Sequence, residues 1–246
     1  MQYATSEGEQ NVKSSAQAES STTIYPYEPP HQLAPNLWQI KGSLSVPVLP
    51  RYMTIYRLSD GTLLLYSVIA MHEEGMRELE KLGTPSVMIM PHDRHQMDAP
   101  FYKRRYPSLR VIAPDPSHTR NVTIDADLSE LNTLGIRAYS LPGTTYHEAV
   151  LELPVEGGIA LCTTELLANM PKRGILGWLA KIVGPPGGGF GVNRVVRWRE
   201  VRDRKKLRVW LTELADRVDI RLISFGHTPP LREHIADELG RAAERA

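Results

Sequence analysis

Residues 86–98 have the sequence SVMIMPHDRHQMD, in which an apolar run is followed at once by a polar loop. The run SVMIM predicts a buried strand. His92, His95 and Asp98 follow at three-residue intervals, at the carboxyl end of the predicted strand, where functional groups gather in open α/β folds. The loop is either an ordinary polar connection that contains histidine or one half of a metal site.

The composition is that of an ordinary globular protein. The chain has 246 residues, of which 41% are hydrophobic and 23% are charged, enough for a sizeable core. A formal net charge of +1 gives no reason to expect nucleic acid or a membrane as partner, and no apolar run has the length of a membrane span. Cys162, the single cysteine, excludes an internal disulfide. We expect a cytoplasmic protein with a disordered polar leader at residues 1–22 and one domain at residues 23–246.

Strands and helices alternate on both sides of the histidine loop. The first half predicts a hairpin at 52–58 and 62–69, a helix at 72–83, helical turns at 99–107, a strand at 109–114 and a short helix at 127–135. The second half predicts strands within 136–143 and 148–167, an amphipathic helix at 201–218, a strand at 220–226 and a helix at 231–246. This order indicates two β-rich halves, each covered by helices.

Further metal-ligating side chains follow other predicted strands. His147 lies in LPGTTYHEAVLEL, Glu165 follows GIALCTT, and His227 follows LISFG. Imidazole nitrogen and carboxylate oxygen are ligands that suit Zn²⁺ or Fe²⁺. Because no two of these residues have the HExxH spacing, a site would have to be assembled from several loops. Each residue also has a structural interpretation, such as a helix start for Glu165 or a turn for His227.

The order of these segments resembles the metallo-β-lactamase fold superfamily. The chain has LSDGTLLLYS, PHDRHQMD, LPGTTYH, TTELL and SFGHTPP where that superfamily has its strand pair, HxHxDH, PGHT, an aspartate and a final GH. The resemblance implies an α/β (α+β) fold, a four-layer αββα sandwich. This chain departs from the superfamily pattern in two places. In the first motif its candidate ligands lie three residues apart, and Thr144 stands where PGHT has its histidine. Carried over residue by residue, the resemblance implies these metal ligands: His92, His95, Asp98, His147, Glu165 and His227.

The same resemblance implies a metal-dependent hydrolase with a small-molecule substrate. One or two ions of zinc, or of iron or manganese, would generate hydroxide for attack on an ester, thioester, lactone or phosphoester. Asp98 would be catalytic, orienting the water and moving its proton. A single ion, weak occupancy or an empty site are the alternatives to a full pair. The alternative function is a non-catalytic protein of this fold that binds a ligand or partner.

Three other features carry weaker predictions. The glycine-rich loop 184–191, GPPGGGFG, follows a predicted short apolar helix and is either a lid with Phe190 at its tip or a connector. The segment 194–208 has eight basic and two acidic residues, which favours the solvated face of a helix over a nucleic-acid surface. Cys162 lies in an apolar run and is expected to be a buried packing residue rather than a nucleophile.

Overall fold

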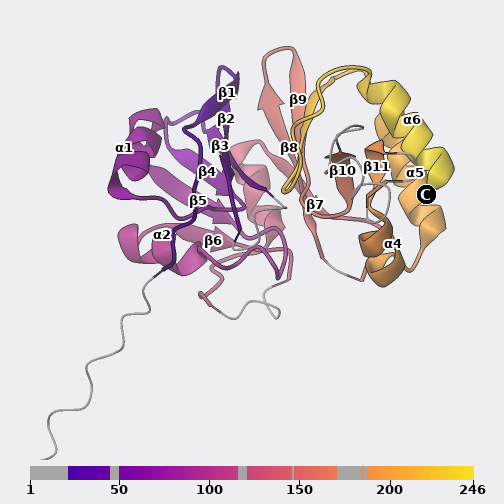
Figure 1. The fold of residues 1–246 in the computed structure, drawn as a ribbon. Helices are drawn as coiled ribbons and strands as arrows, with labels where there is room; N and C mark the ends of the chain where they lie inside the picture. Colours follow the sequence, from indigo (N-terminus) through magenta and orange to yellow (C-terminus); the bar gives the residue numbers. More distant parts are fainter. Residues whose placement is uncertain (1–21, 45–49, 116–120, 146, 171–183, 186–187) are drawn as a thin grey trace, which may run out of the picture.

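Two β-sheets lie face to face at the centre of the molecule, with helices on the outer side of each (Figure 1). The computed structural model describes residues 22–44, 50–115, 121–145, 147–170, 184–185 and 188–246. The first sheet has six strands in chain order: β1 His31–Ala34, β2 Leu37–Gly42, β3 Arg51–Arg57, β4 Leu63–Tyr66, β5 Pro85–Ile89 and β6 Arg110–Ile112. Its helices are α1 Glu73–Leu82 and α2 Ala99–Arg105.

The second half of the chain builds the facing sheet and its helices. The order of its strands is β12 Ile220–Ser224, β9 Gly158–Cys162, β8 Ala149–Val155 and β7 Arg137–Ser140, with β12 parallel to β9. A separate antiparallel pair is formed by β10 Leu167–Met170 and β11 Gly189–Val192. The helical elements are the 3₁₀ helix η2 Leu128–Leu134 and the α-helices α4 Arg194–Glu200, α5 Arg204–Ala215 and α6 Ile235–Arg245.

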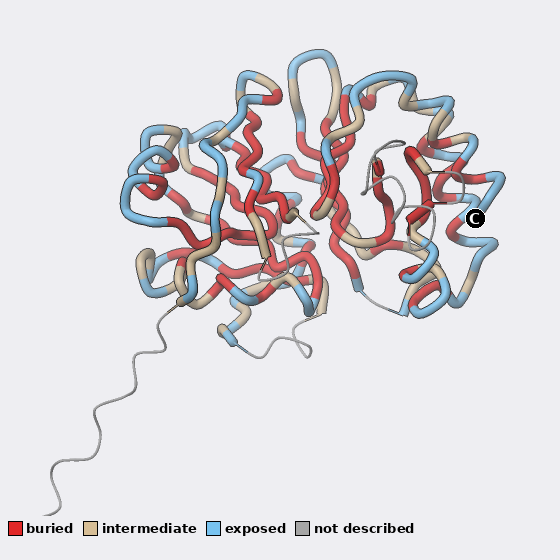
Figure 2. The backbone as a smooth tube through the Cα atoms, viewed as in Figure 1, coloured by how far each residue is buried: buried red, intermediate tan, exposed pale blue. Residues whose placement is uncertain are grey.

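Alternating side chains of the strands divide the core into three layers. In β8, Leu151 and Leu153 belong to the cluster between the sheets, whereas Val150 belongs to the cluster under α5 and α6. In β4, Leu64 faces the other sheet and Leu65 faces the helices. This period of two is what a strand buried on both faces requires, and Figure 2 shows the buried backbone running through both sheets. The predicted αββα sandwich is confirmed.

Buried hydrogen bonds join the two sheets as well as the apolar cluster. The Ser224 hydroxyl on β12 accepts from Gln39 Nε2 at 3.0 Å and lies 2.8 Å from Thr54 Oγ1, both on the first sheet. The Tyr66 hydroxyl donates to the Ala149 carbonyl at 2.7 Å. Two backbone bonds also cross between the halves, from Tyr52 N to Gly226 O and from Ala149 N to Pro91 O, both 2.8 Å long. These directional bonds fix how far one sheet is shifted relative to the other.

Several predicted boundaries were wrong for local reasons. The strand predicted at 62–69 ends at Tyr66, because Ser67 adopts a left-handed conformation with φ of 61°. The helix predicted at 201–218 is shorter, Arg204–Ala215, since the Asp203 carboxylate caps its start by accepting from Lys206 N. Val218 is 88% exposed and is no part of an apolar face.

Phe190, the candidate tip of a glycine-rich lid, is part of the core. Phe190 is buried on β11, with its ring centroid 6.0 Å from that of Phe225, so it is not an exposed lid tip. Cys162 is buried, as expected. The predicted leader (apart from Thr22) and the predicted short helix after Met170 lie outside the described residues. Among the described helices, none combines the length and apolar character that crossing a bilayer requires.

Shortening Leu151 to alanine tests the layer between the sheets. Leu151 is fully buried there, so Leu151→Ala removes packing and leaves a cavity, and we expect a loss of about 2–5 kcal/mol in the free energy of unfolding. The measurement is urea unfolding followed by circular dichroism. Val218→Ala, at an exposed position, is the control and should change stability by no more than about 0.5 kcal/mol. Equal losses in the two variants would contradict the assigned layers.

Candidate metal centre

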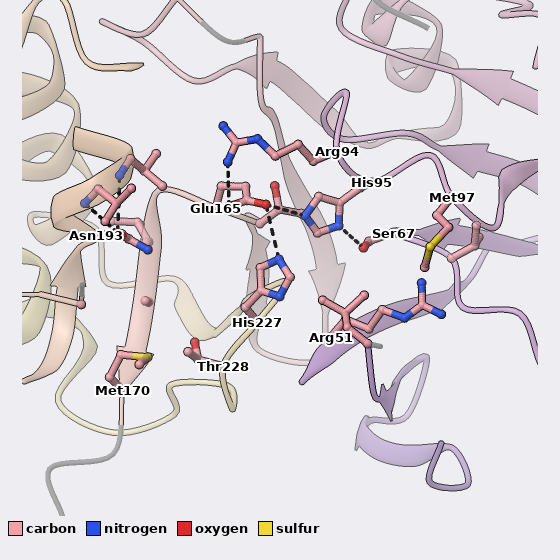
Figure 3. Close-up of a pocket in the computed structure, with 18 residues that line it drawn as sticks. Arg51, Ser67, Arg94, His95, Met97, Glu165, Met170, Asn193, His227 and Thr228 are labelled. Atoms are coloured by element: carbon pink, nitrogen blue, oxygen red, sulfur yellow. Dashed lines mark hydrogen bonds and ion pairs between the residues drawn. The ribbon is translucent and has the colours of Figure 1, made fainter. Parts of the chain in front are cut away.

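Three side chains from separate loops meet between the two sheets (Figure 3). His95 lies in the loop after β5, Glu165 in the turn after β9, and His227 just after β12. Glu165 Oε1 lies 3.0 Å from His95 Nε2 and 3.3 Å from His227 Nε2, and the three ligand atoms are all within 4.8 Å of one another. Metal–ligand bonds of about 2.0–2.2 Å place neighbouring ligand atoms roughly 3–3.5 Å apart. The donor types and the spacing therefore fit one divalent ion.

Each histidine is oriented by its second ring nitrogen. His227 Nδ1 donates to the Pro50 carbonyl at 2.9 Å, and this bond turns its Nε2 toward Glu165 Oε1, 3.3 Å away. His95 Nδ1 lies 2.7 Å from the hydroxyl of Ser67. Histidines that bind metal ions use such partners to fix the tautomer and the ring direction. Gly226 leaves room for this arrangement, because a Cβ there would lie 3.1 Å from His95 Cε1.

The charges at the centre favour the ligand forms of His95 and Glu165, whereas for His227 burial is outweighed by the hydrogen bond and charge of Glu165, which raise the pKa, so a bound ion would have to displace its proton. Burial lowers the pKa of His95 below its usual value, which favours the neutral ring. Burial alone would raise the pKa of Glu165, but the hydrogen bonds from His227 and His95 outweigh it and hold that pKa well below its usual value. A neutral imidazole beside an ionised carboxylate is the state in which both groups coordinate metal ions.

Glu148 is a buried carboxylate that the sequence analysis missed. It is 1% exposed, and it accepts three backbone N–H bonds, from Thr164 at 2.5 Å and from Glu165 and Leu166 at 3.2 Å each. These bonds shape the turn that carries Glu165. Burial raises the pKa of Glu148 to about 7, against the opposing effect of the N–H donors. The only signal in the sequence is a carboxylate directly before an apolar strand, next to the histidine that was chosen instead.

Two arginines flank the group. Arg94 Nη1 lies 3.6 Å from Glu165 Oε2, and its Nη2 forms an ion pair with the buried Glu200. Arg51 is buried at the start of β3 and pairs with Asp98, its Nη2 lying 2.5 Å from Asp98 Oδ2. Arg94 therefore holds the second oxygen of Glu165 away from the histidines.

Of the other implied ligands, His92 lies beside the group, with its ring centroid 6.5 Å from that of His95, whereas Asp98 is turned toward Arg51. His92 is buried, with Nδ1 2.6 Å from Asp93 Oδ1, and burial lowers its pKa to about 4. Asp98 accepts from Ala70 N at 2.8 Å, besides pairing with Arg51, and is not among the described residues lining the cavity beside the centre. The chain turns tightly after β5, with a bond from His95 N to His92 O, so residues three apart point in different directions.

His147 is also separate from the group. Its side chain is 51% exposed, and its Nε2 lies 3.7 Å from Asp115 Oδ2. The residue that replaces it near the centre is its neighbour Glu148, which points inward at the start of β8 because successive side chains of a strand alternate in direction. The set of six implied ligands is thus reduced to His95, Glu165 and His227 among the described residues.

A cavity of about 480 Å³ opens beside these three residues. This volume lies in the range of small-molecule sites. Apart from the charged groups already described, its walls are largely apolar. Among the described residues, the apolar part of the lining includes Leu44, Val68, Met97, Leu167, Ala168, Met170, Val195 and Val196.

The fold is that of the metallo-β-lactamases. Solved structures with this fold include the metallo-β-lactamase of Pontibacter korlensis, 12% identical, with a TM-score of 0.58 over 90% of this chain and 100% of that one. DIM-1, in a crystal exposed to ceftazidime, is 12% identical with a TM-score of 0.60 over 91% and 99%. FIM-1 from Pseudomonas aeruginosa, in its mono-zinc form, is 12% identical with a TM-score of 0.59 over 90% and 96%.

At these identities the likeness establishes the fold alone. No family model and no curated protein matches the sequence. Within this fold lies a His/Glu group suited to a metal ion.

Removing two of the three ligands should abolish metal binding. We expect His95→Ala combined with His227→Ala to reduce bound zinc, iron or manganese from near one ion per chain to background, as measured by elemental analysis. His147→Ala, which removes an exposed imidazole outside the group, is the matched control and should retain the ion. Loss of metal in the control alone would place the centre elsewhere.

Glu148 should affect metal affinity without being a ligand. In Glu148→Gln, the amide NH₂ faces backbone donors, so the turn that carries Glu165 loosens and metal affinity falls by roughly 10–100-fold. Competition with a fluorescent chelator measures this loss. Glu152→Gln is the same change four residues further on, within β8, at a buried carboxylate that pairs with Arg137 and Arg217, and should leave affinity unchanged. Equal loss in both variants would indicate general destabilisation.

Proposed function

We propose that the protein is a metal-dependent hydrolase of a small-molecule ester, thioester, lactone or phosphoester. His95, Glu165 and His227 would hold one zinc, iron or manganese ion. The observation that carries the proposal is the convergence of these ligand atoms, each histidine with its own orienting partner, beside a cavity of about 480 Å³. A bound divalent ion supplies a Lewis acid that polarises a carbonyl or phosphoryl oxygen and lowers the pKa of water.

The chain's own residues divide the remaining work. Glu165 directs Oε1 at the histidines, while Oε2 lies towards Arg94. Arg94 lines the cavity and is 37% exposed, so its positive charge stands where a substrate oxygen gains negative charge. Ser67 and the Pro50 carbonyl hold the two rings in place throughout.

Proton transfer falls to a different carboxylate from the one predicted. Asp98 is paired with Arg51 and accepts a backbone N–H, so it is not positioned to take a proton from an attacking water. Among the described residues that line the cavity, Glu165 is the sole carboxylate. Its Oε2 is the candidate proton acceptor, and because the low pKa of Glu165 makes it a weak base, this role would require an ion that lowers the pKa of water.

The small number of ligating and proton-accepting residues beside the cavity supports the alternative of a non-catalytic binding protein. Three ligands and a single carboxylate leave no second residue in the described lining to share the roles of ligand and base. A protein of this kind would use the cavity to bind a small molecule without turnover. The two proposals differ in whether a metal ion changes the chemistry in the cavity.

A hydrolysis assay separates the two functions. Protein as purified, protein treated with chelator and protein reloaded with zinc, iron or manganese are compared on a panel of esters, thioesters, lactones and phosphoesters. We expect kcat/KM to fall by about a thousandfold or more on chelation, to recover on reloading, and to stay low in Glu165→Gln. His147→Ala is the control and keeps the activity. Folded, metal-loaded protein without turnover on any of these bond classes would favour the binding protein.

A further inference from the structure

Exposed apolar side chains gather at the mouth of the cavity. Among the described residues, six large apolar side chains are exposed, and two of these, Met97 at 47% and Val195 at 41%, line the cavity. A third, Trp198, is 81% exposed. Apolar surface of this kind is costly in water unless something covers it, and it commonly marks a binding site.

Trp198 extends the wall of the cavity along α4. It lies three residues after Val195 on the same helix, and residues with this spacing are neighbours on one helix face. Val196, next to Val195, is 3% exposed and also lines the cavity. The apolar wall therefore continues from the buried side of α4 through Val195 to Trp198.

The inner end of this wall lies at the metal centre. Val68 follows Ser67, whose hydroxyl contacts His95, and Leu167 lies two residues after Glu165. Both line the cavity and are nearly inaccessible, at 5% and 1% exposure. An apolar path thus runs from the His95–Glu165–His227 group, along the wall, to the exposed ring of Trp198.

We propose that this path holds the hydrocarbon chain of an amphiphilic acyl ester or thioester. The hydrolysable carbonyl would lie at His95, Glu165 and His227, and the chain would run past Val195 to Trp198. In the reaction, water adds to the acyl carbon, the bond from that carbon to oxygen or sulfur breaks, and the alcohol or thiol leaves with a proton. The reaction rests on the function proposed above, whereas the chain-binding site can be tested alone.

The continuity of the wall is the reason to assign one molecule to it. A lone apolar rim could equally contact a partner protein or a membrane, but Met97 and Val195 of this rim line the same cavity as the buried Val68, Leu167 and Val196 and the reactive groups. A molecule with a polar, hydrolysable end and an apolar chain matches both ends of that path. The other occupants are outcomes of the test.

Binding of butanoate, octanoate and dodecanoate by calorimetry tests the path. These acids stand in for the acyl product and are used below their micelle concentrations, with the full chain as purified. Each methylene that enters the path should tighten binding about fourfold, so octanoate should bind on the order of a hundredfold tighter than butanoate. Equal affinities for the three acids would overturn the proposal.

Variants at the rim test where the chain runs. Val195→Ser and Trp198→Ser should weaken binding of dodecanoate by about fivefold or more, and of butanoate far less, because the short chain does not reach them. Val218→Ser is the matched control for Val195→Ser, since Val218 is 88% exposed and lies outside the described lining. An equal effect of the two valine variants on dodecanoate would overturn the proposal.

Two further measurements complete the test: binding to lipid vesicles and metal-dependent hydrolysis. If Trp198→Ser reduces binding to phosphatidylglycerol vesicles but leaves the dodecanoate affinity unchanged, the rim is a membrane surface and the proposal is overturned. If the chain-length dependence holds but no metal and no hydrolysis are found, the proposed function fails and the hydrocarbon site stands. If metal-dependent hydrolysis is found with equal affinity for all three acids, only the present inference fails.

Discussion

The arrangement of the centre depends on buried hydrogen bonds that link the two sheets. The apolar cluster between the sheets favours contact but is not directional, so it does not fix one sheet against the other to a few tenths of an ångström. Ser224, bound to Gln39 and Thr54, and Gly226, bound to Tyr52, supply that precision immediately before His227. Since His95 comes from one half of the chain and His227 from the other, the distance between their rings is set by these bonds.

Three carboxylates, buried or nearly so, lie close together in this region. Glu165 and Glu200 share Arg94, and Glu148 is a third buried carboxylate whose charge opposes that of Glu165. Uncompensated buried charge is costly, and a protein lowers this cost either by protonating a group or by binding an ion. A bound cation would lower this cost, which agrees with the donor set of the group.

Segment order was predictable from the sequence, and side-chain direction was not. The alternation of apolar runs with turns was enough to predict two helix-covered sheets, and it correctly placed His95, Glu165 and His227 after strand ends. Spacing alone did not show that the turn after β5 leaves His92 beside the group and directs Asp98 to Arg51, because that depends on backbone bonds within the turn. Spacing also did not show which of the neighbours His147 and Glu148 has its side chain inside the protein, since a shift of one residue turns a side chain from the buried face to the exposed face.

A centre with three ligands relies more on its surroundings than one with six. Losing the direction of one ring in a six-ligand site leaves five donors, whereas here it leaves two, so tolerance for misplacement is small. The chain meets this demand with one fixed partner per ligand: the Ser67 hydroxyl for His95, the Pro50 carbonyl for His227, and Glu148 for the turn of Glu165. These partners lie at the ends of β-strands or in the loops beside them. Each holds its ligand residue, or the turn that carries it, by a direct hydrogen bond, so the rigid sandwich restrains the ligands.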